Sequence, residues 1–182
     1  MDFALFHFLR SLIGRSPFLD DAVLFFARFF PYFIIFALFL FLLRKIHGWK
    51  KRLYVFLTLA LSVILSRGII VEVIRFFYHR SRPFLVLDFT PLFPAESFSF
   101  PSGHAAFFFA LSFVIFYLDR RWGYWFLGAS LLNGLARVVS GVHWPSDILA
   151  GILLGFFGFL CVYYFLNPKR AFLSKKESIQ IE

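Results

Sequence analysis

Three short segments of the sequence combine residue types that chemistry on a phosphate group needs. They read Arg75-x6-Arg82-Pro83, Pro101-Ser102-Gly103-His104 and Arg137-x5-His143-x3-Asp147. Arginine guanidinium groups stay charged and present forked donors that match phosphate oxygens. A helix that starts at Pro101 would add free backbone amides and the positive end of its dipole near Gly103. The segments therefore predict a pocket for a phosphate group.

The two histidines of these segments suit the bond-making and proton-transfer steps of phosphoryl transfer. His143 and Asp147 are four residues apart, so the carboxylate can hold one ring nitrogen and leave the other as a nucleophile. His104, at the phosphate end of its predicted helix, can protonate the leaving oxygen. The spacing predicts a covalent phosphohistidine that water then hydrolyses, with His104 acting as the base.

The same residues admit two other interpretations. A lone histidine in a membrane segment is often a structural group whose hydrogen bonds are satisfied. The spacing of His143 and Asp147 also suits a metal ion, but the neighbouring arginines would repel a cation. With all three segments present we favour a catalytic site, and we expect neither a metal nor a cofactor.

The composition excludes an ordinary soluble domain. Hydrophobic residues make up 60% of the 182 residues, charged residues only 16%, and the mean hydropathy is +0.79. The net charge of +9 could indicate a nucleic-acid partner, but the basic residues form short clusters between apolar runs. Anionic lipid headgroups explain such clusters, so we expect a membrane protein that does not bind nucleic acid.

Long apolar runs must position the three segments. They cover about 18–43, 53–77, 101 to near 119, 122–139 and 145–166, and a shorter amphipathic stretch covers about 3–13. Asp20 and Asp21 are candidate caps of the first run, and Pro101 is a candidate first residue of the third helix. We predict one all-α domain over 1–182: a polytopic transmembrane bundle of five helices, or six if the first stretch re-enters the membrane.

The distribution of charge predicts the orientation of this bundle. With five spans, the loop 44–52, the turn 119–121 and the tail 167–182 share one face, which holds most basic residues outside the three segments. Positive loops mark the cytoplasmic side, so 78–100 and 140–146 fall on the outer side. Every residue of the predicted site lies at that outer side. We expect a multi-pass membrane protein whose site faces outward.

The three segments resemble the signature of the type 2 phosphatidic acid phosphatase (PAP2) superfamily, which reads K-x6-R-P, P-S-G-H and S-R-x5-H-x3-D. The resemblance covers about 75–147. It implies that His143 is the nucleophile, Asp147 its partner and His104 the proton donor. The phosphate-binding positions that it implies are Arg75, Arg82, Ser102, Gly103 and Arg137.

Two positions depart from the signature. Arg75 stands where lysine is usual, which keeps the charge but changes its reach and geometry. Ala136 stands where serine is usual, so one hydrogen bond to the phosphate or to a neighbour is lost. We expect both departures to tune the activity without abolishing it.

The short chain and its N-terminal amphipathic stretch also resemble small bacterial undecaprenyl-diphosphatases. This resemblance implies hydrolysis of undecaprenyl diphosphate to undecaprenyl phosphate; phosphatidylglycerophosphate, phosphatidic acid and lipid A phosphates are alternatives. A non-catalytic protein that binds or translocates a lipid phosphate is the alternative of another class. That alternative predicts a missing nucleophile or proton donor, whereas His143 and His104 are both present. The sequence leaves the oligomeric state open.

Ionisable residues inside the apolar runs need partners. Arg28, Arg67 and Glu72 lie in such runs, and we expect Glu72 to pair with Arg28 or with Arg75 three residues on. A charge this deep in a membrane is costly unless it faces a counter-ion or a polar cavity. We favour ion pairing without direct catalysis for these residues.

Two further pairs lie in the outer loop. His79 and Arg80 could touch a second phosphate group, although such residues are more often simply solvated. Asp88 and Glu96 are carboxylates close together in sequence, and we expect them to cap or solvate the loop. Neither pair is assigned a catalytic role.

Overall fold

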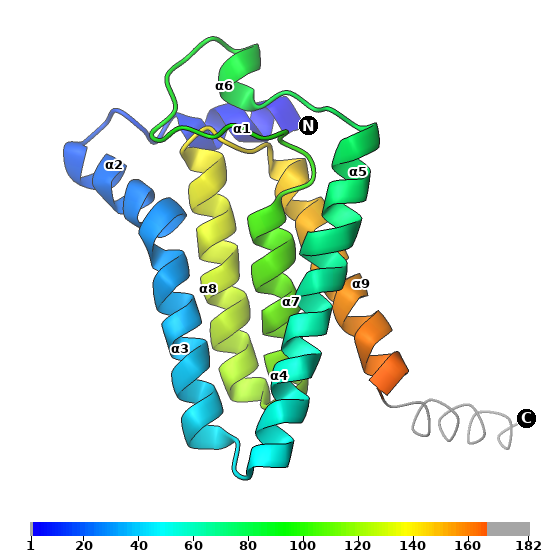
Figure 1. Cartoon of the computed structure of the whole chain (residues 1–182). Helices are drawn as coiled ribbons and strands as arrows, with labels where there is room; N and C mark the ends of the chain where they lie inside the picture. Colours follow the sequence, from blue (N-terminus) through cyan, green and yellow to red (C-terminus); the bar gives the residue numbers. More distant parts are fainter. Residues whose placement is uncertain (1, 167–182) are drawn as a thin grey trace, which may run out of the picture.

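The chain folds into a bundle of long helices, described by the computed structural model for residues 2–166. Within that range the chain is helix and loop, with no strand. Long helices lie side by side, and two short helices cross one end of the bundle (Figure 1). The predicted all-α architecture is confirmed. The basic tail 167–182, expected on the inner face, lies outside the described residues.

Two of the long rods are each built from three consecutive helices, with a π-helical turn in the middle. The first consists of α2 (Pro17–Leu24), η1 (Phe25–Phe29) and α3 (Phe30–Lys45). The second consists of α4 (Trp49–Val63), η2 (Ile64–Ile70) and α5 (Val71–Phe77). The remaining long helices are α7 (Gly103–Leu118), α8 (Arg120–Val139) and α9 (Pro145–Leu166), and the short ones are α1 (Asp2–Arg10) and α6 (Pro83–Val86).

Three helical stretches are long and apolar enough to cross a membrane, which makes this a membrane protein. They are Pro17–Lys45 and Trp49–Phe77, with 29 residues each, and Pro145–Leu166, with 22. α7 is apolar but has only 16 residues, and α8 carries polar side chains along its 20 residues. Both lie beside the three stretches in the bundle (Figure 1), so the five-span count stays a prediction.

The N-terminal helix α1 lies across the end of the bundle (Figure 1). Its side chain Phe6 is fully buried and packs on Trp144, with the two ring centroids 5.0 Å apart. Nine residues are too few to span a bilayer. The structure therefore favours the expected interfacial helix over a sixth span.

The third long helix begins later than predicted. Pro101 is not its first residue: Ser102 is the N-cap, and its hydroxyl accepts a hydrogen bond from the amide of Ala105. The serine hydroxyl pairs with a backbone amide of the first helical turn, and a proline side chain has no oxygen that could do so. The correction places Gly103 and His104 in the first turn of α7.

The predicted caps of the first rod were also wrong. Ser16 occupies the N-cap position and Pro17 the first turn. Asp20 lies inside the helix, where its carboxylate accepts a hydrogen bond of 3.0 Å from the amide of Gly14. Asp20 thus closes the loop that leads into the helix, and a proline in the first turn fixes where the helix begins.

A stripe of glycines lets α9 approach its neighbours closely. A Cβ atom at Gly151 would lie 2.7 Å from the carbonyl oxygen of Ser102, and one at Gly155 would lie 2.8 Å from the amide of Ala110. Small residues at a helix interface let the backbones pack against each other inside a membrane. This contact fixes the start of α7 against the start of α9, where the second and third sequence segments meet.

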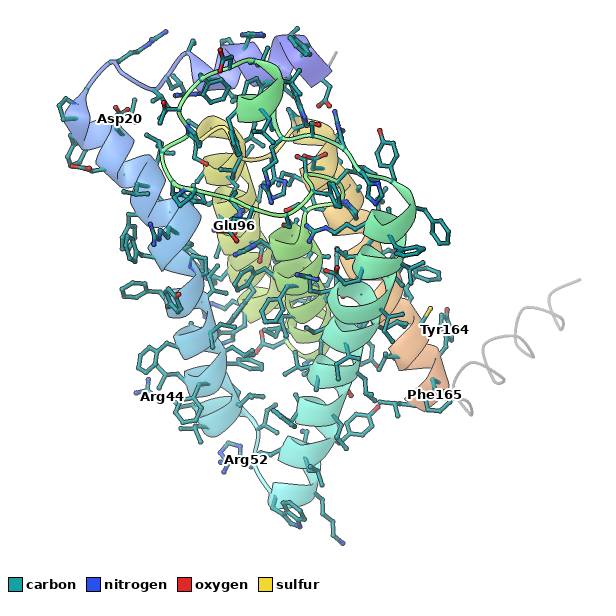
Figure 2. All side chains as sticks on the ribbon, turned by 45° about the horizontal axis from the view of Figure 1, so that its top comes forward. Asp20, Arg44, Arg52, Glu96, Tyr164 and Phe165 are labelled. Carbon is teal, nitrogen blue, oxygen red and sulfur yellow. The ribbon has the colours of Figure 1, made fainter. Side chains whose placement is uncertain are left out.

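The first two rods diverge from a short turn. α3 and α4 are joined at one end of the bundle, and α2 and α5 stand apart at the other (Figure 1). Arg52 fastens the turn by donating to the carbonyl oxygens of Ile46 at 2.7 Å and Leu43 at 3.0 Å. Figure 2 places Arg52 at the end of the bundle away from Glu96. The divergence leaves room for a site near the wide end.

Candidate active site

The ends of several helices meet around one cavity of about 580 Å³ at the wide end of the bundle. Its walls come from the first two rods, the start of α7, the end of α8 and the loop over residues 93–97. Six of the eight predicted site residues line it: Arg75, Arg82, Gly103, His104, Arg137 and His143. The other two, Ser102 and Asp147, are fully buried behind its wall.

His143 is oriented by the carboxylate of Asp147. Its Nδ1 atom lies 3.4 Å from Oδ2 of Asp147 across the turn that begins α9. The ring is buried yet lines the cavity, so its Nε2 atom is the one left for chemistry. Burial lowers the pKa of His143 to about 4, despite the opposing hydrogen bond to Asp147, and the nearby Arg137 and Arg82 add to the lowering. The imidazole is therefore neutral at neutral pH.

Asp147 is itself held by a set of donors. Oδ2 accepts from the hydroxyl of Ser99 and from the amide of Trp144 at 2.8 Å, and Oδ1 accepts from Arg80 at 2.8 Å. Asp147 has no exposed surface, and a buried carboxylate needs such compensation to stay charged. These contacts fix the carboxylate that orients His143.

Arg80 ties Asp147 to the N-terminal helix. Its guanidinium donates to Asp147, to the hydroxyl of Ser146 at 2.6 Å and to Oδ2 of Asp2 at 2.6 Å. Burial alone would raise the pKa of Asp2, but hydrogen bonds from Ser146 and Arg80 lower it below its usual value. The expectation that Arg80 is simply solvated is wrong. Its neighbour His79 stacks on Phe98, with ring centroids 4.4 Å apart.

Arg82 connects two loops at the wall of the cavity. It donates to the carbonyl oxygens of Ser97 and Val142, both at 2.6 Å. Burial and the neighbouring charge of Arg75 lower the pKa of Arg82 to about 10, so it stays positively charged at neutral pH. Arg82 therefore both shapes the cavity and contributes charge to it.

Arg75 and Arg137 are buried at the cavity wall with donors to spare. Arg75 donates to the carbonyl oxygen of Pro101 at 3.1 Å, and Arg137 donates to that of Ala27 at 3.3 Å. The buried Nε atoms of both arginines have no hydrogen-bond partner among the residues that the structure describes. Buried donors are costly to leave unpaired, so these two arginines keep hydrogen-bonding capacity that the described protein groups do not use.

The two departures from the motif have local explanations. Ala136 is buried in a small apolar cluster with Ala27, Phe93 and Val142. A serine hydroxyl there would need a hydrogen-bond partner of its own. Arg75 uses its fork to reach both the carbonyl of Pro101 and, at 3.6 Å, the carboxylate of Glu72, as the sequence suggested. A single lysine nitrogen cannot present two such donors in one plane.

Two more arginines line the cavity, and sequence reasoning gave them no role there. Arg28 belongs to η1 and Arg67 to η2. Arg67 forms an ion pair with Glu72, so ion pairing of Arg67 is confirmed with a partner that had been predicted to pair with Arg28 or Arg75. The available signal was an arginine deep in each of two apolar runs, which points to a polar cavity as readily as to an ion pair.

An apolar groove of about 700 Å³ adjoins the cavity. Side chains of α3, α4 and α7 line it, among them Leu38, Phe56 and Leu111. Ile35 and Phe107 line both the groove and the cavity. A charged chamber therefore opens onto an apolar surface between the two diverging rods.

Comparison with known proteins places this site in a family. A permease described as bacitracin transport permease protein BcrC from Bacillus licheniformis is 30% identical over 176 residues, which cover 96% of this chain and 84% of the relative. Undecaprenyl-diphosphatase BcrC from Bacillus subtilis is 25% identical over 163 residues, which cover 88% and 82% of the two chains. The crystal structure of Aquifex aeolicus LpxE superposes with a TM-score of 0.73 and 26% identity, covering 88% of this chain and 93% of that one.

The family model described as the PAP2 superfamily matches residues 51–171. That region contains all three sequence segments and four of the helices that line the cavity, η2, α5, α7 and α8. The likeness thus covers the site itself and not only the membrane helices. The motifs that resembled a phosphatase signature, the cavity that they line and the matching family agree, and this membrane protein belongs to the PAP2 superfamily.

Proposed function

We propose that the protein hydrolyses a polyprenyl diphosphate, foremost undecaprenyl diphosphate, to the monophosphate and inorganic phosphate. The observation that carries the proposal is an arginine-lined cavity with a buried, carboxylate-held histidine that opens onto an apolar groove. A diphosphate headgroup suits the cavity and a polyprenyl tail suits the groove. The Bacillus subtilis relative named undecaprenyl-diphosphatase supports this choice of substrate.

The first step forms a covalent phosphohistidine. Nε2 of His143 attacks the terminal phosphorus, and the bond from that phosphorus to the bridging oxygen breaks. The leaving oxygen takes a proton from His104, which lines the same cavity. Asp147 accepts the hydrogen bond of Nδ1 and stabilises the positive charge that develops on the imidazole.

The second step restores the enzyme. Water attacks the phosphorus of the phosphohistidine and gives a proton to His104. The bond between phosphorus and Nε2 breaks, inorganic phosphate leaves, and His143 is neutral again. Arg75, Arg82 and Arg137 stabilise the charge on the phosphoryl oxygens in both steps, since their guanidinium groups need not reorganise.

The substrate reaches this site from the membrane in our proposal. The apolar groove between α3 and α4 also includes Phe107 and Leu111 of α7 and adjoins the cavity at Ile35 and Phe107. A polyprenyl tail in the groove stays in an apolar environment while the headgroup enters the charged chamber. Phosphatidylglycerophosphate, phosphatidic acid and lipid A phosphates are alternative substrates with the same division into head and tail.

We place the site at the outer face of a bacterial inner membrane. Arg44 and Arg52 lie at the narrow end of the bundle, away from Glu96 at the cavity (Figure 2). Clustered basic residues mark the cytoplasmic end of membrane helices. The cavity, at the other end, then opens toward the outer leaflet.

A transport function is the second candidate, because the Bacillus licheniformis relative carries the name of a permease. A protein that only binds or moves a lipid phosphate does not need a nucleophile, its carboxylate partner and a proton donor together. Here His143, Asp147 and His104 surround one cavity or lie directly behind its wall. The complete set favours hydrolysis.

The decisive experiment measures phosphate release by the purified protein in detergent with EDTA. The substrates are undecaprenyl diphosphate, phosphatidylglycerophosphate and phosphatidic acid. We expect release from the diphosphate to persist in EDTA and to fall about a thousandfold or more in His143→Ala. His47→Ala, a histidine outside the cavity, should keep full activity. Absence of release from every lipid, or equal release by His143→Ala, would favour the permease.

A further inference from the structure

The cavity holds more positive charge than one phosphoryl group requires. Five arginines line it, against a single lining carboxylate, Glu96. The family resemblance accounts for three of the arginines. The remaining two, Arg28 and Arg67, come from different membrane rods and converge on the same chamber. An arginine placed at this depth without a function is costly.

Both extra arginines sit in π-helical turns. Arg28 lies in η1 and Arg67 in η2, and these are the π-helical segments of the described chain, residues 2–166. A π turn widens a helix and frees backbone carbonyls, so it is rare and occurs often at functional sites. Its recurrence at two cavity arginines indicates that the backbone is shaped to aim these side chains.

The turn that carries Arg28 is held in place by α8. Asn133 donates to the carbonyl oxygens of Phe26 at 2.7 Å and Ala27 at 3.3 Å, and Arg137 also donates to Ala27 at 3.3 Å. These buried donors satisfy carbonyls in the π turn. Arg137 therefore connects the turn of Arg28 to the reacting end of the cavity.

Arg67 lies directly over the start of α7. A Cβ atom at Gly103 would lie 2.8 Å from Cδ of Arg67 and closer still to its Nε, so glycine makes room for this side chain. Glu72 pairs with Arg67 from a half-exposed position outside the cavity lining. The pair orients the guanidinium while one face of it remains turned to the chamber.

The placement gives the cavity two ends. His143, Arg75 and Arg82 mark the end where the phosphoryl group reacts. Ile35 and Phe107 mark the other end, because they also line the apolar groove. Arg28 is two turns from Ile35 along the first rod, and Arg67 lies over the first turn of the helix that carries Phe107. Arg28 therefore lies toward the groove, and Arg67 lies between the two ends, beside Gly103 and sharing Glu72 with Arg75.

We infer that Arg28 and Arg67 form a second anion subsite, which binds the lipid-linked phosphate of a diphosphate substrate. This inference rests on the proposed phosphatase function and deepens it. With the terminal phosphate at His143 and the tail in the groove, the inner phosphate lies between the two, within the part of the chamber that Arg67 and Arg28 line. The subsite makes the enzyme prefer a diphosphate to a monophosphate. It also stabilises the negative charge on the lipid phosphate that leaves.

The test compares two lipids with one tail, farnesyl diphosphate and farnesyl monophosphate, in the purified full-length enzyme. The measured quantity is the kcat/KM for the diphosphate divided by the kcat/KM for the monophosphate. Arg28→Gln and Arg67→Gln should each lower this ratio by about 10- to 100-fold, the range expected for one charge-assisted contact. Arg44→Gln removes an exposed arginine of the first rod outside the cavity and should leave the ratio unchanged.

A second measurement does not depend on turnover. Methylenediphosphonate, whose bridge cannot be hydrolysed, should inhibit the wild type far more strongly than inorganic phosphate does. Arg28→Lys and Arg67→Lys keep the charge and serve as substitutes if the glutamine variants do not fold. In these lysine variants, the stronger inhibition by methylenediphosphonate should shrink but persist. The subsite is overturned, and the phosphatase function stands, if two quantities are the same in every variant as in the wild type. These are the kcat/KM ratio and the preference for methylenediphosphonate over inorganic phosphate. Absence of turnover of either lipid by the wild type would instead overturn the proposed function.

Discussion

The environment of Asp147 shows how a buried charge is kept ready for catalysis. The carboxylate accepts from a serine hydroxyl, a backbone amide and an arginine before its contact with His143 is counted. That contact, at 3.4 Å, is the longest of the set. The shorter bonds fix the carboxylate independently of the histidine. Arg80 is then a positioning residue for the reaction.

Loss of Arg80 should slow turnover more than it weakens binding. Arg80→Gln removes the charged partner of Asp147 and its link to Asp2, without changing the cavity lining. We expect kcat to fall by about 10- to 100-fold with KM changed far less. Arg80→Lys should recover part of kcat. Arg15→Gln, an exposed arginine, is the control, and a fall in its kcat of the same size would contradict the assignment.

In the proposed mechanism, the low pKa of His143 sets the acid limit of the reaction. Burial places this pKa near 4, so lowering the pH protonates the ring and removes the lone pair that attacks phosphorus. We expect kcat/KM to fall about tenfold per pH unit below the pKa of His143. The substrate also changes its ionisation with pH. Its ionisation is measured by phosphorus NMR, and the kcat/KM values are corrected for it. An acid limb centred at about pH 6.5, the ordinary histidine value, would contradict this prediction.

At the scale of elements, the glycines of α9 control where the second and third motifs meet. Gly155→Ala places a methyl group within 3 Å of the backbone of α7. We expect it to lower the thermal stability of the purified protein, by roughly 1–3 kcal/mol, because backbone atoms cannot move aside as a flexible side chain does. Phosphate release should fall as well, since α7 carries His104.

Gly128→Ala is the matched control for this prediction. Gly128 is an exposed glycine of α8, and no atom lies within 4 Å of the position that an added methyl group would take. Alanine favours a helix over glycine by about 1 kcal/mol, so this variant should keep or raise the melting temperature. Equal melting temperatures for the two variants would mean that α7 and α9 are not tightly packed.

Much of this arrangement could be predicted from the sequence, because the relevant signals are local. Apolar runs gave the helices, and short motifs placed His143 and Asp147 one turn apart, as the structure has them. Contacts between distant residues had no such signal. Arg80 meets Asp2 across 78 positions, and no spacing rule connects them.

The π turns were hidden for a different reason. One extra residue per turn leaves the average hydropathy of a long apolar run unchanged, so composition cannot reveal it. The direction of Arg28 and Arg67 depends on that turn. The sequence therefore indicated two arginines in the membrane but could not indicate that both line the cavity.

At the scale of the whole molecule, the cavity and the basic turn between α3 and α4 lie at opposite ends of the bundle (Figure 1). If the cavity faces outward, Thr90 in the outer loop is accessible from outside and Lys51 from inside; both are exposed in the structure. The native Cys161 must first be replaced by alanine.

Single-cysteine variants then test the orientation directly. A membrane-impermeant maleimide should label Thr90→Cys in intact bacterial cells, and Lys51→Cys only after permeabilisation. For each variant, labelling of intact cells is divided by labelling after permeabilisation, which corrects for differences in expression. The reversed pattern would place the reaction on the cytoplasmic side and overturn the proposed location.

The π turns also have an evolutionary consequence. Each can be regarded as an α-helix with one residue inserted, so deleting one residue from 25–29 would restore the α-helical register. Residues on one side of the deletion would then rotate by about 100° relative to those on the other. Arg28 would turn away from the chamber while every motif residue kept its identity. A one-codon length change is thus enough to add or remove a pocket charge, and alignments that score only substitutions would miss it.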